Sequence, residues 1–375
     1  MHTRVCDMLG VEFPILAFSH CRDVVAAVTN AGGFGVLGAV AHSPEQLEID
    51  LSWIEAETRG RPFGVDLLLP AKYAGADEGG LDRESVRQLL PPAQQEFVDD
   101  ILRRYEVPPL PGDSESSGRL DLMRVSPKGY EPLLDVAFAH RLKLIASALG
   151  APPPWLIERA HASDVMVAAL AGTVVHAERH AAAGVDVIVA QGTEAGGHTG
   201  EIGTMVLVPD VVDAVAPVPV LAAGGIGSGR QIAAAMALGA EGVWCGSVWL
   251  TTEEAETHPV VKEKFLTATA RDTVRSRSLT GKPARMLRTA WTDEWDREDA
   301  PATLAMPLQG ALVGEAQTRI ARSARDNAGA HELVNYFVGQ VVGRMGKIKP
   351  ARQVVLEMVN EYADIVTRFA EQAQG

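Results

Sequence analysis

The sequence has few cysteines, no long apolar run and no excess of basic residues. Its three cysteines, Cys6, Cys21 and Cys245, follow no paired spacing among 375 residues, which argues against a disulfide framework and favours a reducing compartment. No apolar run approaches the roughly 20 residues of a membrane span, and no basic-then-apolar signal stands at the N-terminus. These absences predict a cytoplasmic protein without a membrane partner.

The balance of charge is acidic. The formal net charge is −14 at pH 7, whereas binding to a nucleic-acid backbone requires a concentrated basic face. We therefore expect no nucleic-acid partner. Hydrophobic residues make up 47% of the chain and charged residues 22%, which is typical of an ordinary globular enzyme. Small molecules are the expected partners, and formation of a homodimer stays open.

Short apolar runs alternate with amphipathic helical patterns along most of the chain. Strands joined mainly by helices predict a closed parallel sheet, a (β/α)8 TIM barrel, more than an open sheet. Such a barrel takes about 250 residues, so the chain has room for an appended piece. The expected barrel strands are 14–18, 35–40, 63–69, 142–147, 165–171, 187–191, 219–223 and 243–246.

Residues 71–141 separate the third and fourth expected strands by more than one helix needs. The interval holds a helical pattern at 92–105, a link rich in Pro, Gly and Ser at 108–118, and a second helical stretch. An insertion after a barrel strand emerges on the face where barrel active sites lie. We expect this one to form a cap over the substrate; a surface excursion or an oligomer contact is the alternative.

The strand–helix alternation stops near residue 270. Helical patterns follow at 311–326, 331–344 and 352–374. The sequence therefore predicts a barrel domain over residues 1–270, which includes the insertion, and a mainly helical C-terminal domain over residues 271–375.

A polar, glycine-rich decapeptide follows the sixth expected strand. Residues 191–200 read QGTEAGGHTG, directly after the β-branched run 187–189, which favours a strand buried on both faces of a parallel sheet. The decapeptide then begins at that strand's carboxyl end. There the amide of Gln191 can donate to, and accept from, the edge of a heterocycle.

The same decapeptide carries a single histidine behind paired glycines. Gly196 and Gly197 allow the backbone to approach a flat ligand closely, because no Cβ intervenes. His198 titrates near neutrality, so it can take a proton from a weak carbon acid or return one. A satisfied surface histidine in a glycine-rich turn is the alternative.

A second glycine-rich segment follows the seventh expected strand. Residues 221–230 read LAAGGIGSGR and precede a helical pattern. The backbone N–H groups of Gly224, Gly225 and Gly227 and the start of that helix are expected to point at one spot, as a barrel does when it holds a phosphate. Simple tight turns are the alternative.

The eighth expected strand ends in a related way. Residues 244–247 read WCGS, and Gly246 and Ser247 can supply the second half of a phosphate site. Two glycine-bearing strand ends, one strand–helix unit apart, make a more specific signal than either makes alone.

Two further motifs are weaker. Gly33, Gly35 and Gly38 form a G-x-G-x-x-G, but it follows a helix and enters a strand, which is the wrong context for a dinucleotide-binding fold. His176 and His180 lie one helical turn apart and could chelate a metal. Their helix is expected in the outer ring, so we favour a solvated face and predict no metal site.

These motifs together resemble the nitronate monooxygenase family, also called the 2-nitropropane dioxygenase-like family, of FMN-dependent TIM-barrel enzymes. Flavin enoyl-acyl-carrier-protein reductases and NADH:quinone reductases share the same core. The resemblance runs over residues 11–250 with gaps at the insertion. It extends more weakly through TGKPAR (280–285), MPLQ (306–309) and YFVGQ (336–340).

The resemblance implies FMN as the cofactor and His198 as the catalytic histidine beside the flavin. It further implies that Gln191 and Gly196 contact the isoalloxazine and that Gly225 and residues 244–247 hold the phosphate. The full expected cofactor-binding set is Asp66, Gln191, Gly196, Gly197, Gly224, Gly225, Gly227, Trp244, Cys245, Gly246 and Ser247.

The sequence departs from the family pattern at Asp66. The segment FGVDLL (63–68) matches a family segment whose fourth position is usually an asparagine that contacts the cofactor. A carboxylate there would disfavour an anionic reduced flavin unless it were protonated or paired. Gly339 and Gln340 stand where family members bring a C-terminal segment back to the flavin, and His20 either faces the pocket or is structural.

Two reactions are consistent with this resemblance. The first is oxidation of an alkyl nitronate by O2 to a carbonyl compound and nitrite, with His198 deprotonating a neutral nitroalkane or holding the anion. The alternative is a flavin reductase that takes hydride from NADH or NADPH and passes it to a quinone or an α,β-unsaturated thioester. A barrel that only binds flavin is a third, less favoured hypothesis.

Overall fold

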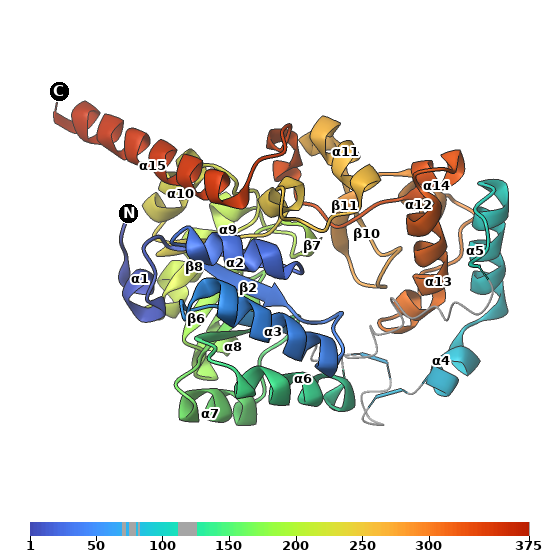
Figure 1. Cartoon of the computed structure of the whole chain (residues 1–375), viewed down its shortest axis with the longest axis horizontal. Coiled ribbons are helices and arrows are strands. Elements are labelled where there is room, and N and C mark those ends of the chain that lie inside the picture. The colour runs from blue at the N-terminus through green and yellow to red at the C-terminus, as the bar shows by residue number, and fades with distance from the viewer. Residues whose placement is uncertain (70–72, 75–79, 82, 112–125, 375) are drawn as a thin grey trace.

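The computed structural model describes residues 1–374 except 70–72, 75–79, 82 and 112–125. Part of the Pro/Gly/Ser-rich link predicted at 108–118 therefore lies outside the described residues. The molecule is elongated in Figure 1, with the barrel at one end and a smaller group of helices at the other.

The predicted (β/α)8 barrel is confirmed. Eight parallel strands close in the order β1-β2-β3-β4-β5-β6-β8-β9, and β1 pairs with β9 to complete the ring. The strands are β1 (Ile15–Ser19), β2 (Phe34–Gly38), β3 (Gly64–Leu68), β4 (Leu144–Ala148), β5 (Met166–Ala171), β6 (Val187–Gln191), β8 (Val220–Ala223) and β9 (Gly242–Cys245).

Helices cover the outside of the barrel (Figure 1). Several end in a left-handed glycine, as at Gly32, Gly184 and Gly239, where φ is 94°, 92° and 95°, and each glycine turns the chain toward the next strand. The helices before and between the strands are α1 (Arg4–Leu9), α2 (Arg22–Asn30), α3 (Pro44–Thr58), α6 (Pro127–Ala139), α7 (Pro154–Ala162), α8 (Val174–Ala182), α9 (Thr204–Val215) and α10 (Gly229–Ala237).

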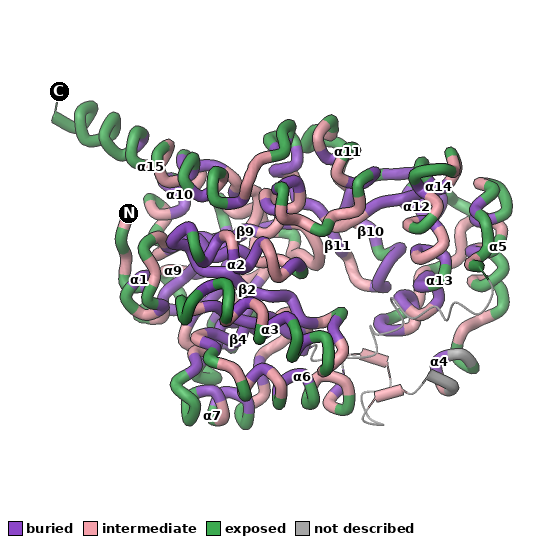
Figure 2. Tube along the Cα trace, viewed as in Figure 1, coloured by how far each residue is buried: buried purple, intermediate pink, exposed green. Residues whose placement is uncertain are grey.

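The strands are buried on both faces, as their near-continuous apolar composition predicts. On β6, Val187 and Val189 join a cluster that fills the barrel interior, whereas Ile188 and Ala190 pack outward against the helices. Figure 2 shows this buried sheet surrounded by helices that are exposed on their outer sides. The alternation fixes which side chains at each strand end point into the barrel and which point away.

The G-x-G-x-x-G motif belongs to the barrel wall and not to a dinucleotide site. Gly35 and Gly38 lie within β2, and a Cβ on Gly35 would overlap the carbonyl oxygen of Val25 in α2. Glycine is therefore needed here because helix and strand pack closely.

The insertion after β3 contributes to a second hydrophobic core. Its helices are α4 (Arg83–Leu89) and α5 (Pro92–Arg104), and α5 packs on α13 (Leu308–Ser323). Arg104, at the end of α5, donates paired hydrogen bonds of 2.6 and 2.7 Å to Glu294 and so links the insertion to the C-terminal region. The remaining helices of this region are α11 (Pro259–Thr267), α12 (Ala290–Trp295) and α14 (Ala328–Leu333).

The described residues of the insertion do not line the main cavity. They reach its wall indirectly, since the Ala74 N–H donates to the carbonyl of Met306 over 2.9 Å, and Met306 is a lining residue. A cap formed by the whole of residues 71–141 stays a prediction.

The C-terminal region contains a small sheet that the sequence patterns did not predict. Strands β10 (Thr273–Ser276) and β11 (Ala284–Leu287) pair antiparallel, and β11 also pairs with the two-residue strand β7 (Gly197–His198). The prediction of one continuous helix over 331–344 is wrong. Helix α14 ends at Leu333, an extended segment follows it, and a 3-10 turn covers Gln340–Arg344.

The last helix returns to the barrel. Helix α15 (Ala351–Gln374), which the sequence analysis assigned to the C-terminal domain, packs against α10 and α2. Gly229 permits close contact, because a Cβ there would overlap the backbone of Met358 and Tyr362. The α15 helix thus occupies the place of the eighth barrel helix.

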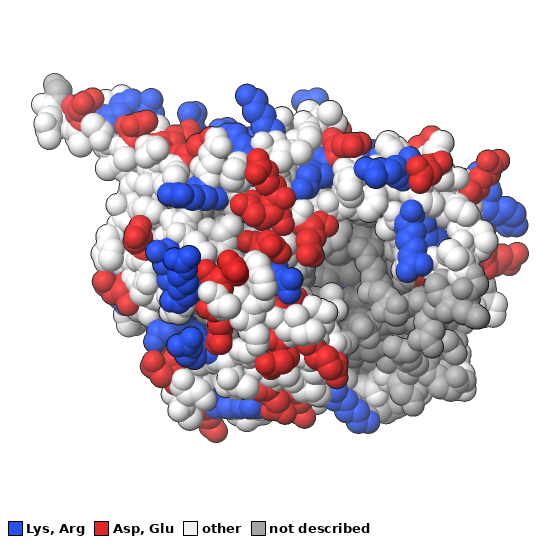
Figure 3. Space-filling model, viewed as in Figure 1, with Lys and Arg blue, Asp and Glu red and all other residues white. Residues whose placement is uncertain are grey.

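The surface agrees with the acidic composition. Figure 3 shows acidic and basic side chains interspersed on one face, without a broad basic surface. Among the described residues, no helix is both long and apolar enough to cross a membrane.

Candidate active site

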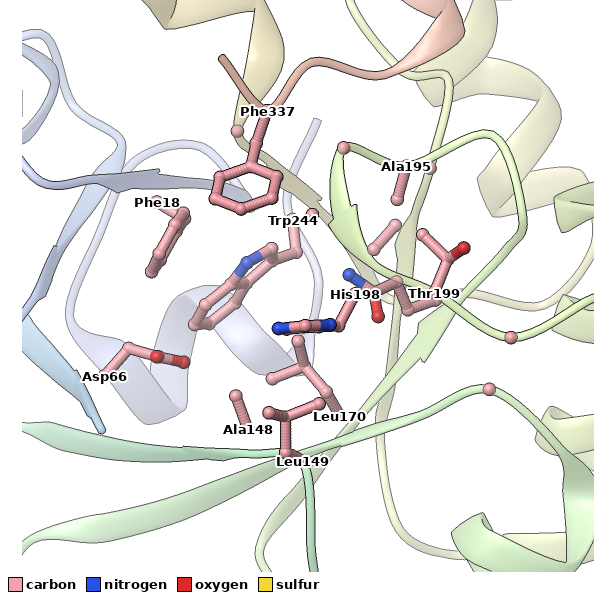
Figure 4. Close-up of a pocket in the computed structure, with 18 of the residues that line it drawn as sticks. Phe18, Asp66, Ala148, Leu149, Leu170, Ala195, His198, Thr199, Trp244 and Phe337 are labelled. Carbon is pink, nitrogen blue, oxygen red and sulfur yellow. The ribbon is translucent and has the colours of Figure 1, made fainter. Parts of the chain in front are cut away.

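A cavity of about 650 Å³ opens at the carboxyl ends of the barrel strands, which is within the usual size of a cofactor or substrate pocket. Side chains from several strand ends and from the C-terminal region border it. Figure 4 shows Phe18 and Trp244 on one side, Leu149 and Leu170 on another, and the ring of His198 projecting between them. Barrel enzymes carry their active sites at this face.

The small antiparallel sheet fixes the position of His198. His198 pairs with Ala284 of β11, and its Nδ1 lies 3.3 Å from the carbonyl oxygen of Pro283. A carbonyl can only accept, so Nδ1 carries the hydrogen and Nε2 keeps its lone pair. Burial, chiefly, lowers the pKa of His198 to about 4. At neutral pH the site therefore holds a neutral imidazole with one acceptor nitrogen.

Arginines of the same sheet brace the loop that carries His198. The Arg285 Nε donates to the carbonyl of Thr193 over 2.8 Å, and Arg275 donates to the carbonyl of Thr199 over 3.3 Å. Across the loop, the Thr204 hydroxyl donates to Glu194 over 2.8 Å. The glycine-rich loop is thus fixed from two sides.

Of the glycines predicted to hold a phosphate, Gly224, Gly225 and Gly246, here called the glycine rim, line the same cavity, whereas Gly227 does not. Gly224 and Gly225 have φ of 105° and 72°. Residues that carry a Cβ adopt this backbone conformation only at an energetic cost. Within the part of the chain that the structure describes, the N–H groups of Gly224, Gly225 and Gly246 donate to no protein acceptor. The Gly227 N–H, by contrast, donates a hydrogen bond of 3.0 Å to the side-chain oxygen of Gln231.

Ser247 is committed to a structural contact. Its hydroxyl accepts a hydrogen bond of 2.8 Å from the Gly339 N–H, and the Gln340 N–H donates to the carbonyl of Glu194 over 2.9 Å. A Cβ on Gly196 would lie 2.8 Å from the nitrogen of Gly339. The segment around Gly339 is therefore seated against the loop that carries His198.

Polar groups on the barrel strands complete the cavity wall. Gln191 ends β6, and its side-chain amide bonds to no described residue. Asp66 is the middle residue of β3, borders the cavity and is 5% exposed. Burial raises the pKa of Asp66 well above its usual value. Its carboxyl group is thus favoured in the neutral, protonated form, which can both donate and accept as an asparagine amide does.

Trp244 and Cys245 point to opposite sides of β9. The Trp244 side chain belongs to the barrel-interior cluster and stacks on Phe18 with ring centres 6.3 Å apart. Cys245 packs in the outer layer, and burial raises the pKa of its thiol to about 12. Only backbone atoms of Cys245 can therefore serve a ligand in the cavity, and all three cysteines are free.

The two histidines of α8 differ: His176 is exposed, as predicted, whereas the predicted solvated face is wrong for His180. His180 is 4% exposed, and its Nε2 lies 3.2 Å from the carbonyl of Leu170. Both His176 and His180 border the outer part of the cavity. His20 also borders it, and its Nδ1 donates to the carbonyl of Gly38 over 2.8 Å.

Several cavity residues were not singled out from the sequence. Lys282 and Phe337 border the cavity beside His198, and Arg285 orients the loop. The only available signal was that Lys282 and Arg285 lie in TGKPAR and Phe337 in YFVGQ, segments quoted for family resemblance and not for chemistry.

Comparison with known proteins decides the family. A sequence model described as nitronate monooxygenase matches residues 3–361, nearly the whole chain. The chain belongs to the nitronate monooxygenase family. The resemblance drawn from the sequence motifs is thereby confirmed, and the protein is an oxidoreductase of the flavin type.

Relatives of this nitronate monooxygenase family member cover its full length. It is 69% identical to a proposed monooxygenase, Rv1533, of Mycobacterium tuberculosis over 98% of each chain. It is 28% identical to a proposed nitronate monooxygenase of Staphylococcus aureus over 97% of this chain and 98% of the relative.

Two solved structures are also similar along their whole length. A nitroalkane oxidase from Streptomyces ansochromogenes has a TM-score of 0.78 at 29% identity, covering 97% of this chain and 99% of the other. FabK from Thermotoga maritima has a TM-score of 0.73 at 28% identity, covering 99% of each.

Proposed function

We propose that this protein is an FMN-dependent nitronate monooxygenase that converts an alkyl nitronate and O2 into a carbonyl compound and nitrite. The observation that carries the proposal is the neutral imidazole of His198, which borders the same cavity as the glycine rim and keeps its Nε2 as an acceptor. Atoms and charge balance when two nitronate ions and one O2 give two carbonyl compounds and two nitrite ions. Membership of the family supports the assignment.

The residues of the cavity fit FMN. The free N–H groups of Gly224, Gly225 and Gly246 suit a phosphate, which accepts hydrogen bonds only. Gln191 and a protonated Asp66 offer donors and acceptors to the polar edge of the ring system, and Trp244 and Phe18 offer apolar surface. When bound, FMN would supply the electron transfer between substrate and O2 that no protein side chain provides.

The protonation state of His198 favours a substrate that has already lost its proton. A general base works best when its pKa is near the working pH, and a pKa of about 4 makes His198 a weak base at pH 7. Removal of a proton from a neutral nitroalkane is then slow, whereas a nitronate needs no such step. We therefore expect nitronates to be better substrates than the parent nitroalkanes.

His198 cannot hold the anion by donating a hydrogen bond. Its single hydrogen lies on Nδ1 and is shared with the Pro283 carbonyl. Its role toward substrate is thus limited to accepting a proton through Nε2. Phe18, Leu170 and Phe337 exclude water from this side of the cavity, which strengthens every polar interaction inside it.

Aerobic turnover tests the proposal. Purified protein loaded with FMN is mixed with ethylnitronate, and nitrite release and O2 consumption are followed together. The expected result is two nitrite ions per O2, with a kcat/KM higher for ethylnitronate than for nitroethane. Nitrite release that does not exceed the rate with free FMN would contradict the proposed reaction.

A flavin reductase is the second candidate. It is favoured by the similarity to FabK, which is close to that of the nitroalkane oxidase, and by the extra helices after β3. Anaerobic mixing with NADH or NADPH separates the two. Rapid bleaching of the flavin by a nicotinamide, without bleaching by nitronate, would support the reductase.

A further inference from the structure

Lys282 stands next to the residue that orients His198. It belongs to the turn between β10 and β11, directly before Pro283, whose carbonyl receives the His198 Nδ1 hydrogen. Lys282 borders the cavity together with Thr280 and Met306. Its charge is near enough to contribute to the lowered pKa of His198.

The ammonium group of Lys282 is half-buried and has no partner among the described residues. In the described part of the chain it makes no hydrogen bond and no ion pair, and burial lowers its pKa. Removing a cation from water is costly unless hydrogen bonds or an opposite charge compensate. An unpaired cation on a cavity wall therefore indicates that its partner is the ligand.

The other half-buried lysines show the contrast. Lys262 donates to the carbonyls of Thr252 and Ala255 over 2.9 and 3.0 Å. Lys264 caps the end of α14, where it donates to the carbonyl of Val334 over 2.9 Å. The remaining two form ion pairs, Lys143 with Asp164 and Lys349 with Glu357. Among the described lysines that are half-buried, Lys282 alone lacks a partner inside the protein.

Among the described residues that line the cavity, only Asp66 bears a carboxyl group. His198 is neutral, and burial raises the pKa of Asp66, which favours its protonated form. Arg179, exposed at the outer part of the same cavity, adds a second positive charge. The described residues that line the cavity therefore favour an anion, although the whole chain carries a net charge of −14.

We propose that Lys282 binds the negatively charged oxygen atoms of the substrate and so selects small oxyanions, with a planar carboxylate-like or nitronate-like group placed beside His198. This inference deepens the proposed function, because a nitronate is such an anion. It assigns the anion to Lys282 and leaves His198 to act as a proton acceptor. The phosphate of FMN is held separately, by the glycine rim.

Binding to the oxidised holoenzyme, without turnover, tests this assignment. Wild type and the variants Lys282→Gln, Lys282→Arg and Lys347→Gln are titrated with nitrate, propionate and the neutral analogue propionamide. Perturbation of the flavin absorbance reports binding, and bound FMN is measured for each variant. Lys347 is exposed and serves as the matched control.

We expect nitrate and propionate to bind at least tenfold more weakly to Lys282→Gln than to wild type, and Lys282→Arg and Lys347→Gln to bind within threefold of wild type. Propionamide should bind weakly to all four. Equal anion affinity in Lys282→Gln, tight binding of propionamide, or no response of wild type to either anion would overturn the proposal.

Loss of FMN from Lys282→Gln would also overturn it, because the lysine would then serve the cofactor phosphate. The outcome is separable from the proposed reaction. Anion binding that depends on Lys282, in a protein that oxidises no nitronate, would refute the nitronate monooxygenase proposal and leave the anion site intact.

Discussion

The two sides of the cavity are built in different ways. The glycine rim consists of backbone groups from two neighbouring strand ends, β8 and β9, and its parts are close in sequence. The opposite side consists of side chains, among them His198 and Lys282, which are brought together by pairing of β7 with β11. The proposed ligand of the rim, the phosphate of FMN, is the same for every substrate, whereas the side-chain wall can change with the substrate.

The largest expected effect, loss of FMN and of every reaction that needs it, comes from changing the glycine rim. Gly225 has a φ of 72°, and a Cβ there would lie 3.3 Å from Glu194 Cβ. Gly225→Ala should weaken FMN binding at least tenfold, because the strained backbone turns its N–H away. Gly60→Ala is the matched control: Gly60 also has a positive φ, of 80°, but nothing lies within 4 Å of its Cβ position.

Both glycine variants should lose about 1 kcal/mol of stability from backbone strain. Only Gly225→Ala should lose yellow colour during purification, and FMN fluorescence after release measures the content. Full FMN occupancy in Gly225→Ala would argue against the rim as the cofactor site.

The next prediction tests the role of the His198 imidazole apart from the other side chains on the same side of the cavity. His198→Asn removes the acceptor Nε2, so kcat/KM for nitroethane should fall on the order of 10²–10⁴-fold, while that for ethylnitronate should stay within about tenfold of wild type. His331→Asn, an exposed histidine far from β7 in sequence, is the control.

The pH profile sharpens the same prediction. His198 accepts a proton only when neutral, that is, above its pKa of about 4. Nitroethane activity of wild type should therefore decline only as the pH falls toward 4, and not near the ordinary histidine value of about 6.5. Unchanged nitroethane turnover in His198→Asn would remove the proton-acceptor role.

A smaller effect tests the brace behind the histidine. Arg285→Met breaks the bonds to Thr193 and Thr273, each worth roughly 1.5–3 kcal/mol when the donor is charged. We expect faster hydrogen exchange in the loop over 192–200 and a lower kcat, with FMN retained. Arg288→Met, on an arginine that is 57% exposed, should change neither; equal exchange in both variants would contradict the brace.

The smallest effect concerns Asp66. The folded state holds the Asp66 proton at pH values where the unfolded chain has released it, because burial raises the pKa. Its contribution to stability is therefore present below the unfolded pKa of about 3.9 and is lost as pH rises through the folded value.

Asp66→Asn removes the loss of stability that occurs when Asp66 releases its proton. The variant should be more stable than wild type at pH 7, on the order of 1 kcal/mol, and the difference should shrink toward pH 4. Thermal unfolding across this range measures it, with the exposed Asp213→Asn as control. A difference that does not change with pH would mean that Asp66 is ionised in the fold.

The sequence predicted the parts of the molecule that depend on local pattern. The strand predicted over 187–191 is β6 with the observed bounds, and Gly224, Gly225 and Gly246 lie on the cavity, because each feature is set by neighbours along the chain. Strand β7 could not be predicted, since two residues show no periodicity.

Properties that depend on distant partners were not accessible from the sequence. His180 is buried because α8 turns that face toward Leu170, a result of packing and not of spacing. Whether Lys282 has a partner depends on all the elements around it. Helix α15 covers the barrel because it packs against α10 and α2, which are distant in sequence.

Anaerobic mixing of the FMN-loaded protein with ethylnitronate, NADH and NADPH in separate experiments, followed at the flavin absorbance band, tests the central claim most directly. The account predicts that ethylnitronate changes the flavin spectrum within seconds and that neither nicotinamide does so at equal concentration. Bleaching by NADH or NADPH with no response to nitronate would contradict it.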